Sequence, residues 1–134
     1  MLLIYGSTGY TGRLIVTEAL AHGLRPTLAG RNAEAVRTQA QASGLEWRAA
    51  RIDDPAGLDA ALAGATVVLH CAGPFAHTWR AVSDACLRQH AHYLDITGEI
   101  PVFEGLAPRD AEAKAAAIML LPGTGFDVVP SDCL

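Results

Sequence analysis

The chain has 134 residues, of which 51% are hydrophobic and 18% are charged, so it contains enough apolar material for one folded domain and is not intrinsically disordered. The net charge is −4 with scattered basic residues, and the longest apolar run is residues 115–121, which argues against nucleic acid as a partner and against a membrane span. The three cysteines have no C-x-x-C spacing and no signal peptide is evident, so we expect a cytoplasmic protein with reduced thiols and no metal site.

The first apolar run, residues 2–5, is hydrophobic on both faces and ends at Gly6. Strands buried on both faces belong to parallel sheets that helices cover. The pattern then predicts a helix over residues 10–22, which Gly23 ends. We expect its buried side to be formed by Leu14, Ile15, Ala19 and Leu20.

The middle of the chain alternates between strands and helices in the same way. Two helix starts carry residues that accept hydrogen bonds from free amides, and both helices end at a glycine. In chain order the predicted elements are a strand at 26–29, a helix from the cap Asn32 to Gly44, a strand at 46–52, and a helix from the cap Asp54 and Pro55 to Gly64.

The clearest strand covers residues 66–71, and Gly73 and Pro74 end it. The later part of the chain repeats the alternation with apolar runs between helical patterns. The remaining predicted elements are a helix at 78–89, a strand at 93–96, a helix at 108–116 and a strand at 117–121.

This alternation is typical of an α/β fold with right-handed crossovers. We predict a Rossmann-type, doubly wound parallel sheet of about six strands in the order 3-2-1-4-5-6, with a flavodoxin-like order as the alternative. Ser131 followed by Asp132 is typical of another helix start. We therefore expect residues 1–134 to be one dinucleotide-binding domain, cut where a second domain would begin.

Glycines follow the first strand in the spacing G-x-x-G-x-x-G and open the first helix, which is the context of a dinucleotide-binding turn. Gly6 allows a sharp turn, Gly9 lets backbone amides approach a pyrophosphate, and Gly12 lets the helix pack on the sheet. The helix dipole and nearby hydroxyls would add to anion binding. A tight turn without a ligand is the alternative. The candidate pyrophosphate-binding residues are Gly6, Ser7, Thr8, Gly9, Tyr10, Thr11 and Gly12.

Arg31 follows the second strand, where the adenosine ribose of a dinucleotide lies in this fold. No acidic residue occurs between Glu18 and Glu34 to hold a 2′-hydroxyl, and a guanidinium matches a 2′-phosphate. We therefore expect NADP in preference to NAD, with an ordinary solvated arginine as the alternative. Asp53 is a candidate neighbour of the adenine.

Ala72, Gly73 and Pro74 follow the fourth strand and leave the backbone accessible to the middle of the cofactor. Cys71 is expected to be a small buried residue, and the histidines are expected to be structural or solvated. Polar residues at 95–99 and 123–127 follow the next two strands, where they are either site residues or loop caps.

Five ordered motifs span nearly the whole chain: Tyr-Gly-Ser-Thr-Gly-Tyr-Thr-Gly at 5–12, Leu-Ala-Gly-Arg-Asn at 28–32, His-Cys-Ala-Gly-Pro-Phe at 70–75, Tyr-Leu-Asp-Ile-Thr-Gly-Glu at 93–99 and Gly-Phe-Asp-Val-Val-Pro-Ser-Asp at 125–132. Together they resemble the N-terminal NAD(P)-binding domain of the saccharopine dehydrogenase-like family, especially its trans-acting enoyl reductase branch. The resemblance implies a Rossmann domain and hydride transfer from a nicotinamide cofactor to a C=N or C=C bond. It also implies a second domain that supplies much of the site for a small-molecule substrate. By the same resemblance, residues 6–12 hold the pyrophosphate, Arg31 meets the adenosine ribose, and residues 72–74 line the path to the nicotinamide.

Two functions remain open on the residues alone: an NADP-dependent oxidoreductase, and a dinucleotide-binding sensor or scaffold without catalysis. The only lysine, Lys114, has Asp110 four residues before it, so the Tyr-x-x-x-Lys pair of short-chain reductases is missing and no catalytic residue is indicated. We expect this chain alone to be inactive and, with apolar surface uncovered, to form homo-oligomers.

Overall fold

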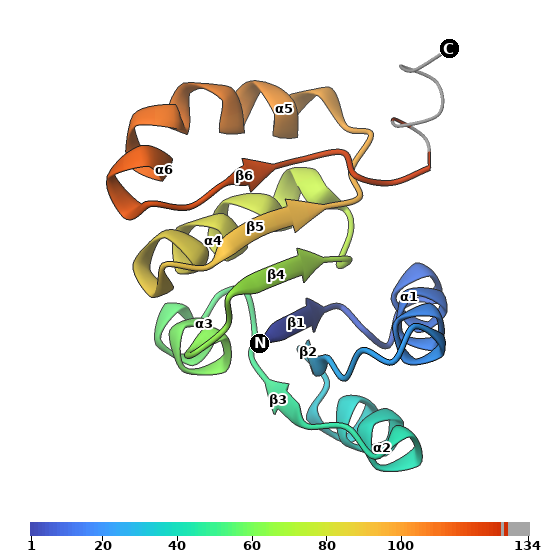
Figure 1. The fold of residues 1–134 in the computed structure, drawn as a ribbon. Helices are drawn as coiled ribbons and strands as arrows, with labels where there is room; N and C mark the ends of the chain where they lie inside the picture. The colour runs from blue at the N-terminus through green and yellow to red at the C-terminus, as the bar shows by residue number, and fades with distance from the viewer. Residues whose placement is uncertain (127, 129–134) are drawn as a thin grey trace.

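The computed structural model describes residues 1–126 and 128, so the helix start expected at Ser131 and Asp132 lies outside the described residues. Six parallel strands form one sheet in the order β3-β2-β1-β4-β5-β6, which confirms the predicted Rossmann order and excludes the flavodoxin-like one (Figure 1). The strands are β1 Leu2–Tyr5, β2 Thr27–Gly30, β3 Trp47–Ala49, β4 Val67–His70, β5 His92–Asp95 and β6 Leu120–Leu121.

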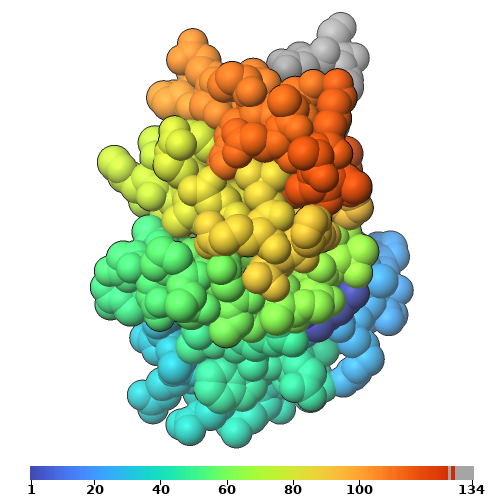
Figure 2. Space-filling view, turned by 90° about the vertical axis from the view of Figure 1, so that its left-hand side faces the viewer, coloured from blue at the N-terminus to red at the C-terminus, as the bar shows by residue number. Residues whose placement is uncertain are grey.

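Helices cover both faces of the sheet and join successive strands. They are α1 Tyr10–Ala21, α2 Ala33–Ser43, α3 Pro55–Leu62, α4 Phe75–Gln89, α5 Ile100–Leu106 and α6 Asp110–Ala116, with a 3-10 turn, η1, at Ala107–Arg109. On the face that Figure 2 shows, the colours run from cyan at the bottom to orange at the top. Each half of the chain therefore occupies its own half of the molecule.

Successive side chains of β1 point to opposite faces of the sheet and pack into two separate hydrophobic cores. Ile4 faces one side of the sheet and packs with Val16 of α1 and Val36 of α2. Leu3 and Tyr5 face the other side, in a larger core that α3, α4 and α5 complete. Both faces of the central strand are thus buried, as its uniformly apolar sequence predicts.

The two predicted side-chain caps are present. Asn32 Oδ1 accepts a hydrogen bond from the amide of Ala35 (3.0 Å), and Asp54 Oδ1 accepts one from the amide of Gly57 (3.0 Å). Each such cap stabilises a helix start by about 1 kcal/mol. Gly44 ends α2 in the left-handed region (φ 63°), which favours glycine.

Three predicted elements had clearly wrong bounds. Helix α4 begins at Phe75 instead of residue 78, because a carboxylate from another loop satisfies its first amides. The third and sixth strands are much shorter than predicted, at Trp47–Ala49 and Leu120–Leu121. Both are edge strands, which pair on one side alone and are commonly short.

The buried side of α1 also differs from the expectation. Leu14 is 55% exposed, whereas Gly12, Val16 and Ala19 are buried. Gly12 lies against the backbone of the preceding turn, and this close approach sets the rotation of the helix on the sheet. Residues at positions i, i+4 and i+7 from Gly12 therefore face inward.

Helix α5 was not predicted, because Pro101 and Gly105 interrupt its helical pattern. Burial of Val102 and Leu106, one turn apart, holds it against the larger core. A Cβ on Gly105 would collide with the indole of Trp79, so this glycine forms the socket in which α4 and α5 meet.

Arg109 ties η1 and α6 to α4 from a buried position. Its guanidinium donates to Ser83 Oγ (2.9 Å), forms an ion pair with Asp84, and bonds Glu112 (3.0 Å). Because a buried guanidinium must have its donors satisfied, these three partners fix the position of the last helix.

Candidate functional site

A cleft of about 620 Å³ opens at the carboxyl ends of β1 to β4, where the strand order reverses between β1 and β4. Open parallel sheets bind ligands at this switch point. The structure brings the following predicted site residues together on its wall: Gly6, Thr8, Gly9, Arg31, Asp53, Ala72, Gly73 and Pro74. Ser7 and Gly12 lie buried behind that wall, while Tyr10 and Thr11 are exposed at the start of α1.

The three motif glycines meet different surroundings. Gly6 has φ +87°, and a Cβ there would lie 2.7 Å from the amide nitrogen of Ala72. A Cβ on Gly12 would collide with the carbonyl oxygen of Gly6. A Cβ on Gly9 would meet, among the described atoms, just that same oxygen at 3.4 Å, which is an ordinary contact. Gly6 and Gly12 are therefore required by the fold, whereas the fold itself has room for a side chain at position 9.

Helix α1 presents an open N-terminus to the cleft. Its first backbone bond runs from Arg13 N to Gly9 O (3.0 Å), and within the described chain no side chain caps it. The amides of residues 10–12 consequently have no partner inside the helix. Asn32, Asp54 and Glu99 occupy the starts of α2, α3 and α4, whereas the start of α1 carries no described capping side chain. An uncapped helix N-terminus is a geometry that suits an anion.

Charged side chains gather where β2 and β3 end. Arg31 lines the cleft, and so does Arg51, which forms a forked pair with Asp53 (Nε–Oδ1 2.8 Å, Nη2–Oδ2 2.7 Å). The hydrogen bond from Arg51 lowers the pKa of Asp53, so this carboxylate stays ionised. Arg51 was not among the predicted site residues, because the third strand was predicted to extend to residue 52 and ends at Ala49.

Tyr5 supports this corner of the cleft from below. Its hydroxyl donates a hydrogen bond to the carbonyl oxygen of Ala50 (2.9 Å), directly before Arg51. Burial raises the pKa of Tyr5 to about 12, with Arg31 lowering it and Asp53 raising it by smaller amounts. The hydroxyl thus remains a neutral donor at physiological pH and lies within the fields of both charged residues.

The wall after β4 is held by a buried hydrogen-bond network. The Thr78 hydroxyl donates to the carbonyl oxygen of Ala72 (2.8 Å), and Nε2 of His70 lies 2.8 Å from the same hydroxyl oxygen. With the hydroxyl proton directed to Ala72, Nε2 carries the imidazole proton. Burial lowers the pKa of His70 to about 3 and raises that of Cys71 to about 12, so both side chains are neutral. Cys71 is therefore not activated as a nucleophile.

The polar residues after β5 act as loop caps. Asp95 is fully buried and accepts hydrogen bonds from the Tyr93 hydroxyl (2.6 Å) and from the amides of Thr97 and Gly123. Glu99 accepts hydrogen bonds from the first two amides of α4, each at 2.8 Å. Of the two interpretations left open for residues 95–99, the structure favours the structural one. Asp127 lies outside the described residues.

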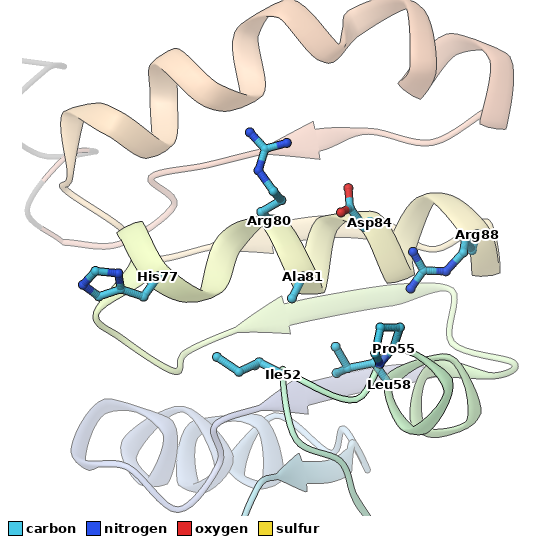
Figure 3. A pocket seen from close by; sticks show the side chains of 8 residues that line it. All are labelled: Ile52, Pro55, Leu58, His77, Arg80, Ala81, Asp84 and Arg88. Carbon is cyan, nitrogen blue, oxygen red and sulfur yellow. The ribbon is translucent and has the colours of Figure 1, made fainter.

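A second groove, of about 320 Å³, runs between α3 and α4 (Figure 3). Ile52 and Leu58 form its apolar side, while α4 contributes charged side chains. Arg88 already forms a forked pair with Asp59, and Arg80 lies over the Trp79 ring. The groove contains no predicted site residue, and its described cations are engaged within the protein.

Residues 1–126 and 128 contain neither a metal-binding cluster nor a membrane-spanning helix. No three or more His, Cys, Asp or Glu side chains in this part of the chain form a group that could hold a metal ion. None of the helices described there is both long and apolar enough to cross a bilayer.

Known proteins are similar to this chain in sequence. The chain is 34% identical to the trans-acting enoyl reductase of Mycobacterium tuberculosis strain H37Rv and 28% identical to the human saccharopine dehydrogenase-like oxidoreductase, in each case over 98% of this chain. It covers 33% and 35% of those proteins, so it spans about a third of the length of these relatives.

Solved structures show the same fold at lower identity. The apo saccharopine dehydrogenase of Saccharomyces cerevisiae has a TM-score of 0.77 at 23% identity, with 94% of this chain and 27% of that one covered. The Citrobacter triphenylmethane reductase complexed with NADP(H) has a TM-score of 0.69 at 20% identity, with 87% and 46% covered.

The family comparison agrees with the resemblance inferred from the five motifs. The sequence model of the saccharopine dehydrogenase NADP binding domain matches residues 2–121, and NADP is the cofactor that the sequence predicted for this chain. Because that match spans most of the chain, the chain belongs to the saccharopine dehydrogenase NADP-binding domain family.

Proposed function

We propose that the cleft binds NADP(H), with the pyrophosphate at the open N-terminus of α1. The observation that carries this proposal is the contrast at Gly9: the fold has room for a Cβ there, yet the residue lies on the cleft wall beside free amides. A glycine that the fold does not need is explained by a ligand that approaches the backbone closely. The residues present therefore fit a dinucleotide.

The same proposal gives the other predicted residues their roles. Arg31 binds the phosphate on the adenosine ribose, and Thr8 adds a hydroxyl beside the pyrophosphate. Residues 72–74 line the nicotinamide half, where the Thr78 hydroxyl holds the carbonyl of Ala72 in place. When bound, the nicotinamide supplies the hydride chemistry, while the protein orients it and excludes water.

We further propose that the longer protein is an oxidoreductase that transfers a hydride to a C=N or C=C bond. Its relatives include a saccharopine dehydrogenase-like oxidoreductase and a trans-acting enoyl reductase, and both are about three times as long as this chain. A second domain would then supply much of the site for a small-molecule substrate. We also propose a cytoplasmic location, which the two described free thiols, Cys71 and Cys86, support.

Titration calorimetry of the 134-residue chain with NADPH and with NADH tests cofactor binding. We expect binding of both, with NADPH bound more tightly. Equal affinity would contradict the proposed role of Arg31, and binding of neither would contradict the proposed function.

A second experiment tests catalysis in the longer protein. The longer protein is mixed with NADPH and with imine or enoyl substrates, and the loss of NADPH absorbance is followed. Oxidation supports the oxidoreductase, whereas tight binding without oxidation of any substrate favours a dinucleotide sensor or scaffold.

A further inference from the structure

Arg31 and Arg51 follow the ends of neighbouring strands, one residue beyond Gly30 and two residues beyond Ala49. Gly30 pairs with Ala49 in the β2–β3 ladder, and the amide of Ala50 donates to the carbonyl oxygen of Gly30 (3.1 Å). Adjacent strands lie about 4.8 Å apart, so the residues that follow them leave the sheet side by side. Both guanidinium-bearing residues line the same cleft.

We propose that Arg51 is a second ligand of the cofactor's 2′-phosphate beside Arg31, and that Asp53 is a positioning residue that orients Arg51 and does not contact the adenosine. This inference rests on the proposed function, since it requires that NADP(H) occupies the cleft. It assigns a role to a residue that the sequence pattern did not indicate, and it changes the role expected for Asp53.

The balance of charge favours this assignment. Arg31, Arg51 and Asp53 together carry a net charge of +1 at this corner, whereas Arg31 and Asp53 without Arg51 would carry none. A phosphate monoester carries a charge of about −1.5 to −2 near pH 7. Arg51 therefore decides whether the corner attracts the 2′-phosphate, although a carboxylate stands beside it.

Arg51 keeps hydrogen-bond donors that can bind a phosphate. Its fork with Asp53 uses Nε–H and one N–H of Nη2. A guanidinium has five N–H donors, so three remain for a phosphate while the fork stays intact. Both carboxylate oxygens of Asp53 are meanwhile engaged with Arg51. The pair thus presents a cation to the ligand and keeps the carboxylate occupied.

The backbone below Arg51 is fixed while its side chain is open to solvent. The buried Tyr5 hydroxyl holds the carbonyl of Ala50, and Gly30 holds the amide of the same residue. The side chain of Arg51 is 70% exposed, so a phosphate can reach it without disturbing the core. Asp53 supplies the one described contact that limits where the guanidinium lies.

Two probes separate the 2′-phosphate from the rest of the cofactor. Adenosine 2′,5′-bisphosphate carries that group, and adenosine 5′-monophosphate lacks it. We expect Arg51→Gln to weaken binding of the bisphosphate by about 10-fold, the size of one charge-assisted hydrogen bond, and to change binding of the monophosphate less than about twofold. Titration calorimetry on the 134-residue chain measures both.

Arg88→Gln is the matched control. Arg88 also forms a forked pair with an aspartate, Asp59, but it lies at the far end of α4 from the cleft, where Figure 3 shows it. This variant loses the same charge and the same type of ion pair, so both probes should bind as they do to the original protein. Thermal unfolding followed by circular dichroism checks that each variant is folded.

The outcomes separate this inference from the proposed function. If NADPH binds the original protein but Arg51→Gln binds the bisphosphate normally, or loses both probes equally, the assignment of Arg51 is overturned alone. If neither probe nor NADPH binds the original protein, the proposed function fails with it. A loss confined to the bisphosphate supports the inference.

Asp53 is tested by a double-mutant cycle with Asp53→Asn and Arg51→Gln. If Asp53 acts through Arg51, the effects of the two substitutions are coupled. The factor by which Asp53→Asn changes bisphosphate affinity should then differ by at least about threefold between the original protein and the Arg51→Gln variant. Monophosphate affinity should stay constant throughout. Additive effects, or weaker monophosphate binding after Asp53→Asn, would show that Asp53 contacts the adenosine itself, as a neighbour of the adenine would.

Discussion

Substitutions at Gly9 and Gly12 should separate cofactor binding from folding. A Cβ on Gly9 meets, within the described chain, a single oxygen at 3.4 Å, and φ is −69°, which any residue adopts. Alanine is a weaker helix cap than glycine, which lowers the stability, but it also reduces the entropy of the unfolded chain, which raises the stability. We therefore expect Gly9→Ala to change the free energy of unfolding by less than about 1 kcal/mol. A Cβ on Gly12 collides with backbone, so Gly12→Ala should cost about 1–3 kcal/mol.

The consequences for binding run the other way. A methyl group on Gly9 lies where the pyrophosphate approaches the amides of α1, and each charge-assisted hydrogen bond lost weakens binding by about 10- to 100-fold. Gly9→Val should abolish measurable binding, because its branched side chain blocks the cradle in every rotamer.

Titration calorimetry with NADPH measures the binding, and thermal unfolding followed by circular dichroism measures the stability. We expect Gly9→Val to unfold close to the temperature of the original protein. Gly12→Ala should unfold about 4 °C lower for each kcal/mol lost. If Gly9→Val binds NADPH normally, the turn is not a pyrophosphate cradle, and if it unfolds, the contrast between the two glycines is wrong.

Three further outcomes are expected. Arg31→Ala should weaken NADPH binding by about 10- to 100-fold and leave NADH binding unchanged, and calorimetry that shows equal losses would contradict its role. Because burial lowers the pKa of His70 to about 3, below that of the unfolded chain, stability is lost as pH falls below about 6.5. Chemical denaturation should show that this residue lowers the free energy of unfolding by about 2 kcal/mol between pH 7 and pH 5. His70→Gln should remove this pH dependence, whereas His77→Gln, at an exposed position, should keep it. Arg109→Ala should cost about 2–4 kcal/mol in chemical denaturation, whereas Lys114→Ala, in an exposed ion pair, should leave the denaturation midpoint almost unchanged.

The strand order and most elements could be predicted from local patterns in the sequence. The apolar strand 2–5, the cap residues Asn32 and Asp54, and the ending glycines each act within a few residues of the element that they define. Such signals do not depend on the rest of the fold. The alternation of strands and helices then left few topologies, and the Rossmann order was among them.

The errors arose where distant contacts override local pattern. Glu99, 24 residues after Phe75 in the sequence, accepts a hydrogen bond from the Phe75 amide and so lets α4 begin earlier. The indole of Trp79 packs against Gly105 and holds α5 in place. Leu14 faces solvent because Gly12 sets the rotation of α1 against the preceding turn. No pattern within one element could have shown these effects.

The candidate site shows the same division. Gly6, Thr8, Gly9 and Arg31 follow strand ends that the sequence marks clearly, so their place at the cleft could be foreseen. Arg51 could not, because the end of an edge strand is weakly marked by pattern and is set by pairing with β2.

The two tryptophans of the chain lie in different halves of the molecule. Trp47 begins β3 and is partly exposed, whereas Trp79 is buried against the socket at Gly105. Fluorescence emission from Trp47 therefore reports on the pairing of edge strand β3 with β2. Fluorescence emission from Trp79 reports on the packing of α5 against α4. Single-tryptophan versions of the protein would show, by stopped-flow fluorescence, whether the two halves of the sheet assemble together or one after the other.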